Sequence, residues 1–239
     1  MKKIILVLGM LVSINTFAKE SITEKKTMIG FNIGTSANTA YTQDENKQET
    51  KNRTKVGGFA SFTFEGRLTD RLSLETGVGY VNKGAANRFK KSALIKSGNT
   101  SYNFHSIDIP LIVKFYIAKK KIFNVNAGGF FSYAFKMNQV TNIDFEQPNL
   151  LNLQDVKNKK ENFPKNAKGE SLFNPIDAGI NFGVEFISQK GFGAGFKLNQ
   201  GFINVMNKEY FTKFTPNPLP VPEKKTLNTG AQLYFIAKF

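Results

Sequence analysis

One stretch of the sequence limits the possible folds more than any other, because its alternate residues suit two different environments. It spans residues 102–117 and reads YNFHSIDIPLIVKFYI. One parity carries Asp108 and Lys114, and the other is continuously apolar, with Ile107, Ile109, Leu111, Val113, Phe115 and Ile117. A β-strand points alternate residues to opposite faces, and roughly ten tilted strand residues cross the hydrocarbon layer of a bilayer. The stretch therefore predicts a transmembrane β-strand.

The first residues have the order of a secretory signal peptide. Two lysines precede an apolar run over residues 4–14, and small residues follow up to Ala18. We predict a signal peptide over residues 1–18 and an outer-membrane β-barrel domain over residues 19–239. No cysteine is present, which excludes a lipid anchor on cysteine, disulfides and thiolate metal sites. No later stretch approaches eighteen uninterrupted apolar residues, so an exported chain that enters a membrane must do so as a closed barrel.

Seven other segments alternate in the same way as the opening stretch. Together they predict strands over residues 28–36, 56–68, 72–84, 102–117, 122–137, 176–187, 192–205 and 227–239. The connections alternate between three or four residues and long polar segments, which cover residues 37–55, 85–101, 138–175 and 206–226. Bacterial outer-membrane barrels show this asymmetry. The predicted fold class is therefore all-β: an eight-stranded antiparallel transmembrane β-barrel with four long external loops and three short periplasmic turns.

The charged residues of the predicted strands all lie on the parity opposite the apolar face. They are Glu65, Arg67, Glu75, Lys83, Asp108, Lys114, Lys136, Asp177, Glu185, Lys197 and Lys238. This parity faces the barrel interior, where charges must be paired. We predict a structural network of paired charges, in preference to a proton or ion relay, formed by Glu65, Arg67, Glu75, Lys83, Asp108, Lys114, Asp177, Glu185 and Lys197.

A soluble β-sandwich or a periplasmic barrel with an apolar core would show the same alternation. The parity opposite the apolar face is nevertheless rich in glycine, at positions such as Gly77, Gly79, Gly193 and Gly195. Glycine suits a crowded barrel interior better than a solvent-facing surface. The same parity also holds apolar residues that indicate a filled lumen, at Phe59, Val81, Ile112, Phe130 and Ile236.

The formal net charge of +15 raises the question of nucleic-acid binding. The predicted export of the chain argues against it, and the basic residues are spread along the sequence rather than gathered in one block. Basic loops near the phosphates of lipopolysaccharide offer another explanation, beside a general compositional bias. We therefore expect outer-membrane lipid and lipopolysaccharide as partners, and no nucleic acid.

His105 is the only histidine in the sequence, and it lies on the outward parity. Adjacent strand residues point to opposite faces, so Ser106 cannot act with His105 in lipid hydrolysis. We expect His105 in an interfacial girdle with Tyr80, Tyr102 and Tyr133. The sequence contains no metal-ligand cluster, phosphate-binding glycine loop or nucleophile elbow. It therefore predicts no catalytic, metal or cofactor-binding site, and no cofactor.

Three segments resemble the PorT-like outer-membrane β-barrel family, also known as the porin family or outer-membrane-protein β-barrel domain. They are SIDIPLIVKFYI at residues 106–117, FEGRLTDRLSLETGVGYVNKG at residues 64–84 and PIDAGINFGVEF at residues 175–186. The terminal Phe239 resembles the signal that the barrel-assembly machinery reads, which implies that machinery as a partner. The resemblance also implies an accessory role in a secretion or gliding apparatus.

These observations predict a non-enzymatic protein of the bacterial outer membrane whose external loops bind a protein partner or shield the surface. The longest of these, residues 138–175, is a candidate contact. One alternative is a small-solute channel, although eight strands leave a lumen only wide enough for side chains. A further alternative is a lipid A-modifying hydrolase that depends on His105.

Overall fold

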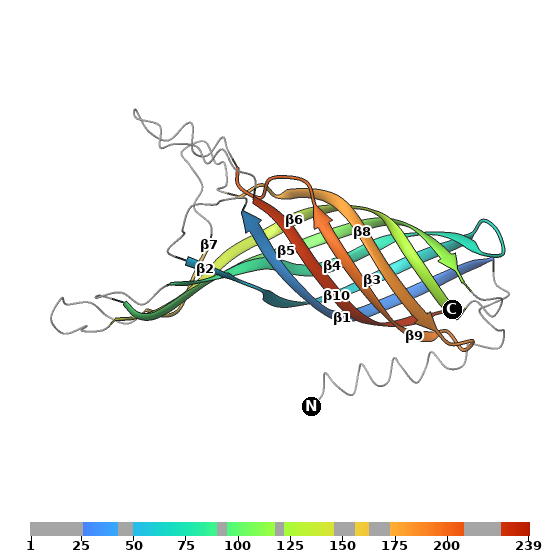
Figure 1. Ribbon diagram of the computed structural model, residues 1–239, viewed down its shortest axis with the longest axis horizontal. Helices are drawn as coiled ribbons and strands as arrows, with labels where there is room; N and C mark the ends of the chain where they lie inside the picture. Colours follow the sequence, from blue (N-terminus) through green and yellow to red (C-terminus); the bar gives the residue numbers. More distant parts are fainter. Residues whose placement is uncertain are drawn as a thin grey trace.

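Every described secondary-structure element is a β-strand, as the period-two pattern predicts (Figure 1). The computed structural model describes residues 26–42, 50–89, 95–117, 122–145, 156–162, 173–207 and 226–239; the predicted signal peptide lies outside these ranges. The strands are β1 (Thr27–Thr42), β2 (Thr50–Arg53), β3 (Lys55–Arg67), β4 (Leu72–Phe89), β5 (Ile95–Tyr116), β6 (Phe123–Phe145), β7 (Val156–Asn162), β8 (Ile176–Ile187), β9 (Phe192–Gly201) and β10 (Thr226–Lys238). Among the described residues, no helix is long and apolar enough to cross a membrane.

Eight of these strands form a closed antiparallel ring. Its order is β1, β3, β4, β5, β6, β8, β9, β10 and back to β1. The ring closes between the first and last strands, whose register runs from Gly30↔Lys238 to Thr42↔Thr226. Phe239 extends this pairing, since its N–H donates to the Ile29 carbonyl at 2.8 Å. The predicted eight-stranded barrel is therefore confirmed.

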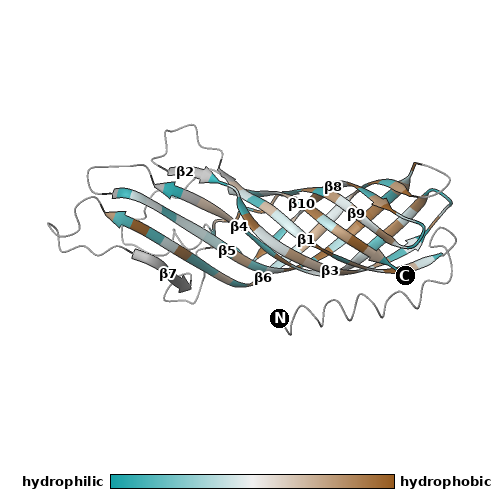
Figure 2. Ribbon diagram, turned by 90° about the horizontal axis from the view of Figure 1, so that it is seen from below, coloured by the Kyte–Doolittle hydropathy of each residue, from teal (hydrophilic) through white to brown (hydrophobic). Residues whose placement is uncertain are grey.

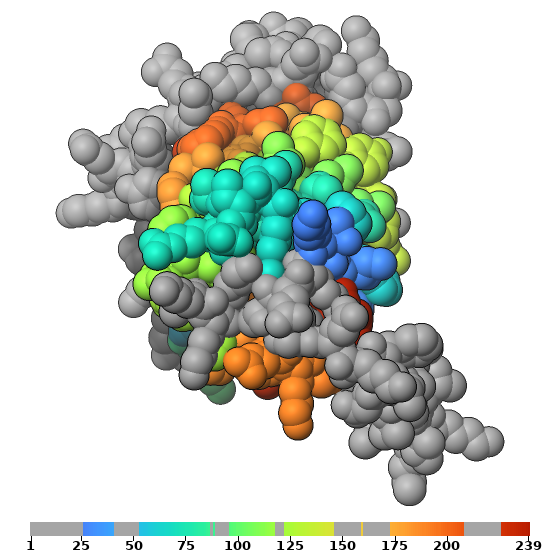
Figure 3. Space-filling view, turned by 90° about the vertical axis from the view of Figure 1, so that its right-hand side faces the viewer, coloured from blue at the N-terminus to red at the C-terminus, as the bar shows by residue number. Residues whose placement is uncertain are grey.

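The short connections gather at one end of the barrel, the turn end, together with the start of β1 and the end of β10. Leu68 and Ser188 each begin a tight turn, in which their N–H groups donate to the carbonyls of Leu72 and Phe192 at 2.9 and 2.8 Å. In Figure 3, which views this end, the teal atoms of the first turn lie beside the blue start of β1. The third short connection contains residues 118–121, which lie outside the described ranges.

The outward side chains of the ring form a continuous apolar belt. On β5 the apolar parity from Ile107 to Ile117 is between 41 and 57 % exposed. Neighbouring strands add further exposed side chains, among them Phe62, Phe64, Phe182, Val184, Phe186, Leu233 and Phe235. Figure 2 shows hydrophobic residues in brown along the strands of the barrel. A continuous apolar surface of this extent requires lipid around it.

Pro110 interrupts the ladder between β4 and β5 within the belt. The register passes from Thr76↔Leu111 directly to Gly79↔Asp108, because proline has no N–H to donate. The Thr76 hydroxyl donates to the Pro110 carbonyl at 2.9 Å. A side-chain donor therefore takes the place of a backbone donor where lipid offers none.

Strands β4, β5 and β6 continue far beyond the belt, and here the sequence-based prediction was wrong. Residues 85–101 and 138–175 were predicted to be loops, yet β4 reaches Phe89, β5 starts at Ile95 and β6 reaches Phe145. Strand β2 pairs with the end of β4, and β7 pairs with the end of β6. We call this part the projecting sheet: residues 50–53, 86–89, 95–103, 138–145 and 156–162.

The projecting sheet was not predicted because its strands lack the alternation of apolar and polar residues. Its strands are rich in Asn, Thr, Ser and Lys, as in IKSGNTSYN at the start of β5. The alternation of apolar and polar residues records a difference between two faces, and it vanishes where neither face meets lipid or a core. Backbone pairing does not require that alternation, so the ladder continues without a sequence signal.

Two apolar clusters fill much of the barrel interior. The inner cluster consists of Met28, Phe59, Val81, Ile187, Tyr234 and Ile236. The outer cap consists of Phe104, Ala134, Phe173 and Val205, with Tyr102, Met137 and Met206 packed against them. The inward apolar positions predicted from the sequence are confirmed, since Phe59, Val81, Ile112, Phe130 and Ile236 are all at most 9 % exposed.

The position of Tyr102 corrects one expectation. We predicted it in an outward girdle with Tyr80 and Tyr133, but its ring packs in the outer cap, 5.6 Å from the ring centroid of Phe173. Tyr102 shares the parity of Phe104, which is inward. Tyr80 and Tyr133 are 41 and 49 % exposed on the outer surface, as predicted.

Tyr234 crosses the interior over a glycine that leaves room for its ring. Gly195 is the cross-strand partner of Tyr234. A methyl group on Gly195 would lie 2.4 to 2.7 Å from the ring and hydroxyl of Tyr234. The ring cannot simply move aside, because its hydroxyl donates to Glu185 Oε1 at 2.9 Å.

We therefore expect Gly195→Ala to lower the free energy of unfolding by about 1–3 kcal/mol through overpacking. The measurement is a urea titration in detergent micelles, followed by circular dichroism and by the shift in gel mobility between folded and unfolded barrel. Gly66→Ala is the matched control, because a methyl group there meets nothing within 4 Å. Equal urea midpoints for the two variants would contradict the packing argument.

Candidate functional site: the barrel interior and its outer end

Five charged side chains from five strands meet inside the barrel and form what we call the ionic cluster: Glu65, Glu75, Lys114, Glu185 and Lys238. Each is at most 2 % exposed. Lys114 Nζ lies 2.7 Å from Glu75 Oε2 and 2.6 Å from Glu185 Oε2. Lys238 Nζ pairs with Glu65 and lies 3.0 Å from Glu75 Oε2. Glu75 thus bridges the two lysines.

Neutral donors bind the other two carboxylates of the ionic cluster. The hydroxyls of Tyr116 and Ser73 donate to Glu65 Oε1 at 2.6 and 2.5 Å. The Tyr234 hydroxyl donates to Glu185 Oε1 at 2.9 Å, and an Asn124 amide donates to its other oxygen at 3.2 Å. Because a buried charge is tolerated only when its hydrogen-bonding capacity is filled, this arrangement is what structural pairing requires.

The formal charges near the ionic cluster balance once Lys197 is included. Three carboxylates and two ammonium groups leave one negative charge. Lys197 Nζ lies 5.5 Å from the centroid of the Tyr234 ring, and that tyrosine bonds to Glu185. Its positive charge brings the formal sum of the six groups to zero.

Two further predicted residues pair nearer the outer end. Lys83 Nζ lies 2.9 Å from Asp108 Oδ2 and donates to Ser132 Oγ at 3.0 Å, while Ser132 donates to Asp108 Oδ1 at 2.6 Å. The lysine also lies 4.6 Å from the centroid of the Phe130 ring.

The remaining predicted network residues contact neutral groups. Asp177 Oδ2 accepts a hydrogen bond from the Asn228 amide at 3.1 Å. The Arg67 guanidinium lies 5.7 Å from the ring centroid of Tyr116. The structure thus brings four of the nine predicted residues into one cluster and pairs Lys83 with Asp108.

Lys238 and Lys136 show where sequence reasoning fell short. Lys238 lies on the inward parity of the last strand, but only ring closure reveals which carboxylates it meets. Lys136 was also assigned to the inward parity, yet it is exposed. The register shifts between His105↔Lys136 and Ser106↔Ala134, so Phe135 is an extra residue that reverses the parity of β6 beyond it.

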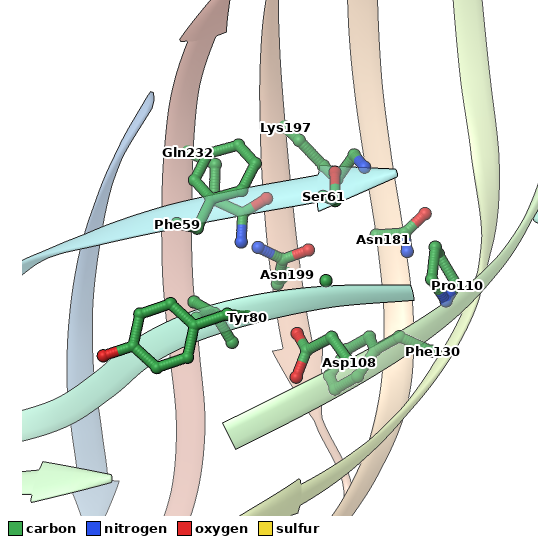
Figure 4. A pocket seen from close by; sticks show the side chains of 12 residues that line it. Phe59, Ser61, Tyr80, Asp108, Pro110, Phe130, Asn181, Lys197, Asn199 and Gln232 are labelled. Carbon is green, nitrogen blue, oxygen red and sulfur yellow. The ribbon is translucent and has the colours of Figure 1, made fainter. Parts of the chain in front are cut away.

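Two cavities that described residues line inside the lumen are small. One of about 40 Å³ is lined by polar side chains from several strands, including Asp108, Asn181, Asn199 and Gln232 (Figure 4). A second, of about 20 Å³, lies under the outer cap beside Lys83 and Asp177. Spaces of this size hold at most a few water molecules. The outer cap and the side chains below it therefore fill the lumen.

His105 lies on the outer surface among aromatic rings. Its Nδ1 lies 2.7 Å from the Tyr80 hydroxyl, and the two rings stack with centroids 6.0 Å apart. Ser106 is 2 % exposed and points inward, so the predicted separation of the two side chains is confirmed. Within the described ranges, no group of three or more His, Asp or Glu side chains could hold a metal ion.

We expect Lys114→Met to lower the free energy of unfolding by about 3–5 kcal/mol, because it leaves buried carboxylates without their cation. Urea titration of the refolded protein measures the change. Lys190→Met is the matched control: Lys190 is exposed in a turn, so the expected change is within about 0.5 kcal/mol.

The double variant Lys114→Met with Glu185→Gln should lose less stability than the sum of its two single variants, because it removes both members of one pair. Additive losses, or a Lys114→Met variant as stable as the control, would show that the ionic cluster does not stabilise the barrel.

Comparison with known proteins finds one family model and several similar solved structures. A family model described as "Outer membrane protein beta-barrel domain" matches residues 17–207. Similar solved structures include Neisserial surface protein A, at 12 % identity, with 90 % of this chain and 96 % of that chain covered and a TM-score of 0.40. Ail of Yersinia pestis is 9 % identical over 90 % of this chain and 100 % of that chain, with a TM-score of 0.38. OprG from Pseudomonas aeruginosa is 12 % identical over 90 % and 97 %, with a TM-score of 0.38.

No curated protein matches the sequence. The family match covers most of the chain, and the apolar belt agrees with it. Barrels of this class place short turns in the periplasm and long connections outside, which puts the projecting sheet on the external side. The protein is an outer-membrane β-barrel, and the chain belongs to the outer membrane protein beta-barrel domain family.

Proposed function

We propose that the protein is a closed membrane anchor that presents the projecting sheet to a protein partner outside the membrane. The observation that carries the proposal is the length of the strands relative to the bilayer. Strand β5 has 22 residues, about 73 Å at 3.3 Å per residue. Roughly ten residues are enough to cross the hydrocarbon layer. The excess length, joined to a filled lumen, supports a role outside the membrane.

The size of the projecting sheet suits a protein contact. Its five segments together contain 32 residues, which at about 3.3 Å per residue and about 4.8 Å between strands present roughly 500 Å² on one face. A standard interface buries about 800 Å² per partner, so one face with its edges approaches that area. Within the described strands, β2 and β7 each pair on one side only. Such edges can add a strand from a partner.

A finer form of the proposal follows from the resemblance to PorT-like proteins: an accessory role in a secretion or gliding apparatus. In that form the partner belongs to the apparatus, and the barrel holds it at the outer membrane. Assembly of the barrel itself through its terminal Phe239 is a separate part of the same proposal.

Affinity isolation from native outer membranes in mild detergent, followed by mass spectrometry, tests the partner role. We expect a stoichiometric companion that is lost when the projecting sheet is shortened. Replacing residues 87–100 and 139–161 by Asn-Gly turns joins Ala86 to Ser101 and Asn138 to Asn162, which are already cross-strand partners. The shortened barrel should still show the gel-mobility shift of a folded barrel.

The matched control is an epitope inserted into the turn between Ser188 and Phe192, at the opposite end of the barrel. It should retain the companion. A full-length protein that is isolated alone, or a shortened barrel that keeps its companion, would overturn the proposal.

We also expect no ion conductance above that of the empty bilayer when the refolded protein is inserted into planar membranes, because side chains fill the lumen. Protease resistance of the same preparation in vesicles verifies that the folded barrel is present. Discrete current steps, or swelling of vesicles in small sugars, would instead establish the small-solute channel.

A further inference from the structure

We propose that the outward face of β3–β6, where the apolar belt meets the projecting sheet, binds an anionic glycolipid of the outer leaflet. The lipid's acyl chains would lie on the belt, its phosphates at a row of basic side chains, and its sugars in a cavity above that row. This proposal is independent of the protein partner, since it concerns the lipid-facing side of the wall.

The register defines where the belt ends on this face. Tyr80, Ile107 and Tyr133 are cross-strand partners on β4, β5 and β6, and all three are exposed. We call them the aromatic row. Tyrosine side chains of this kind lie at the level of lipid head groups, with the ring in the apolar layer and the hydroxyl in the polar one. The hydrocarbon layer therefore ends at this row.

The next row of outward residues is basic and polar. Asn82, His105 and Lys136 are cross-strand partners. Lys55 has the inward parity of β3, and its Nζ donates to the Asn82 side chain and to the Lys83 carbonyl, which fixes Asn82 in this row. We call Asn82, His105 and Lys136 the basic row. Lys136 is exposed because of the extra residue on β6, which turns it outward.

A cavity of about 280 Å³ opens on the same parity higher on the wall. Side chains that line it are Arg53, Arg88, Ser97, Asn99, Asn142 and Asp144. Arg88, Asn99 and Asn142 are successive cross-strand partners on β4, β5 and β6. The cavity is much larger than those inside the lumen.

The side chains of this cavity match a charged sugar. Arg53 and Arg88 are exposed, and a guanidinium binds phosphate or carboxylate through paired N–H donors. Amide groups on Asn99 and Asn142 both donate and accept, as ring hydroxyls require. Asp144, fixed by a 2.7 Å hydrogen bond from Ser97 Oγ, adds an acceptor for hydroxyl groups.

The spacing of the rows matches the layers of one glycolipid molecule. Successive outward rows lie about 6.6 Å apart along a strand, so the basic row follows the aromatic row directly and the row of Arg88 lies about 26 Å beyond the aromatic row. Apolar, phosphate and sugar contacts thus come in the order in which an outer-leaflet glycolipid presents those groups. Among the described side chains of this face, the basic Lys136, Arg53 and Arg88 accompany one carboxylate, Asp144, so the face attracts anions.

Binding of a purified, phosphorylated lipid A–core glycolipid to the full chain in neutral detergent tests the proposal, with native mass spectrometry or thermophoresis as the readout. We expect Arg53→Gln with Arg88→Gln to weaken binding by about tenfold or more, and Lys136→Gln to weaken it as well. Treating the glycolipid with phosphatase should weaken wild-type binding comparably.

Arg71→Gln with Lys190→Gln is the matched control, since it removes two exposed positive charges at the turn end. It should bind like the wild type, and all variants should show the same gel-mobility shift on folding. Binding unchanged in both test variants would overturn the proposal. Equally tight binding of the delipidated core saccharide would also overturn it, because the ligand would then be a soluble acidic sugar rather than a membrane lipid.

Discussion

Ring closure between β1 and β10 is the constraint on which the rest of the structure depends. A bilayer offers no water to unpaired N–H and C=O groups, so a sheet survives there only without edges. The first and last strands therefore pair along nearly their whole length, from Gly30↔Lys238 to Thr42↔Thr226. A local gap in the ladder between β4 and β5, at Pro110, is bridged by the hydroxyl of Thr76. Closure in turn creates a narrow interior that side chains must fill.

Apolar clusters and paired charges together fill the interior of the barrel. Lys114 and Lys238 are shared among three carboxylates. Two of these carboxylates also accept hydrogen bonds from tyrosine hydroxyls. Replacing such a network by apolar residues can be neutral in other proteins, but removing one member leaves a buried charge unpaired. The cluster thus ties together strands that are distant along the chain. It also blocks the lumen, so the surfaces available to a partner lie on the outside of the barrel.

Beyond the belt, the backbone hydrogen bonding between the strands continues, but the side chains on both faces become polar. Strands β4, β5 and β6 keep their hydrogen bonds but lose their apolar face, and β2 and β7 add to them. A sheet with water on both faces is stabilised mainly by backbone hydrogen bonds and by polar cross-strand contacts, such as the one between Ser97 and Asp144. Its rows remain in register with the belt below. That register places basic side chains directly above the aromatic row, at the height where lipid phosphates lie.

The sequence alone determined the barrel, because lipid on one side and a crowded lumen on the other force a period of two on every crossing strand. It also determined the inward parity of residues such as Glu75 and Lys114. Only the tertiary structure decided which charges meet, since partners such as Lys114 and Glu185 lie across the lumen and their approach depends on the stagger of the closed ring. The projecting sheet and the outward turn of Lys136 were likewise decided by pairing and by one extra residue on β6, features that leave no hydrophobic period in the sequence.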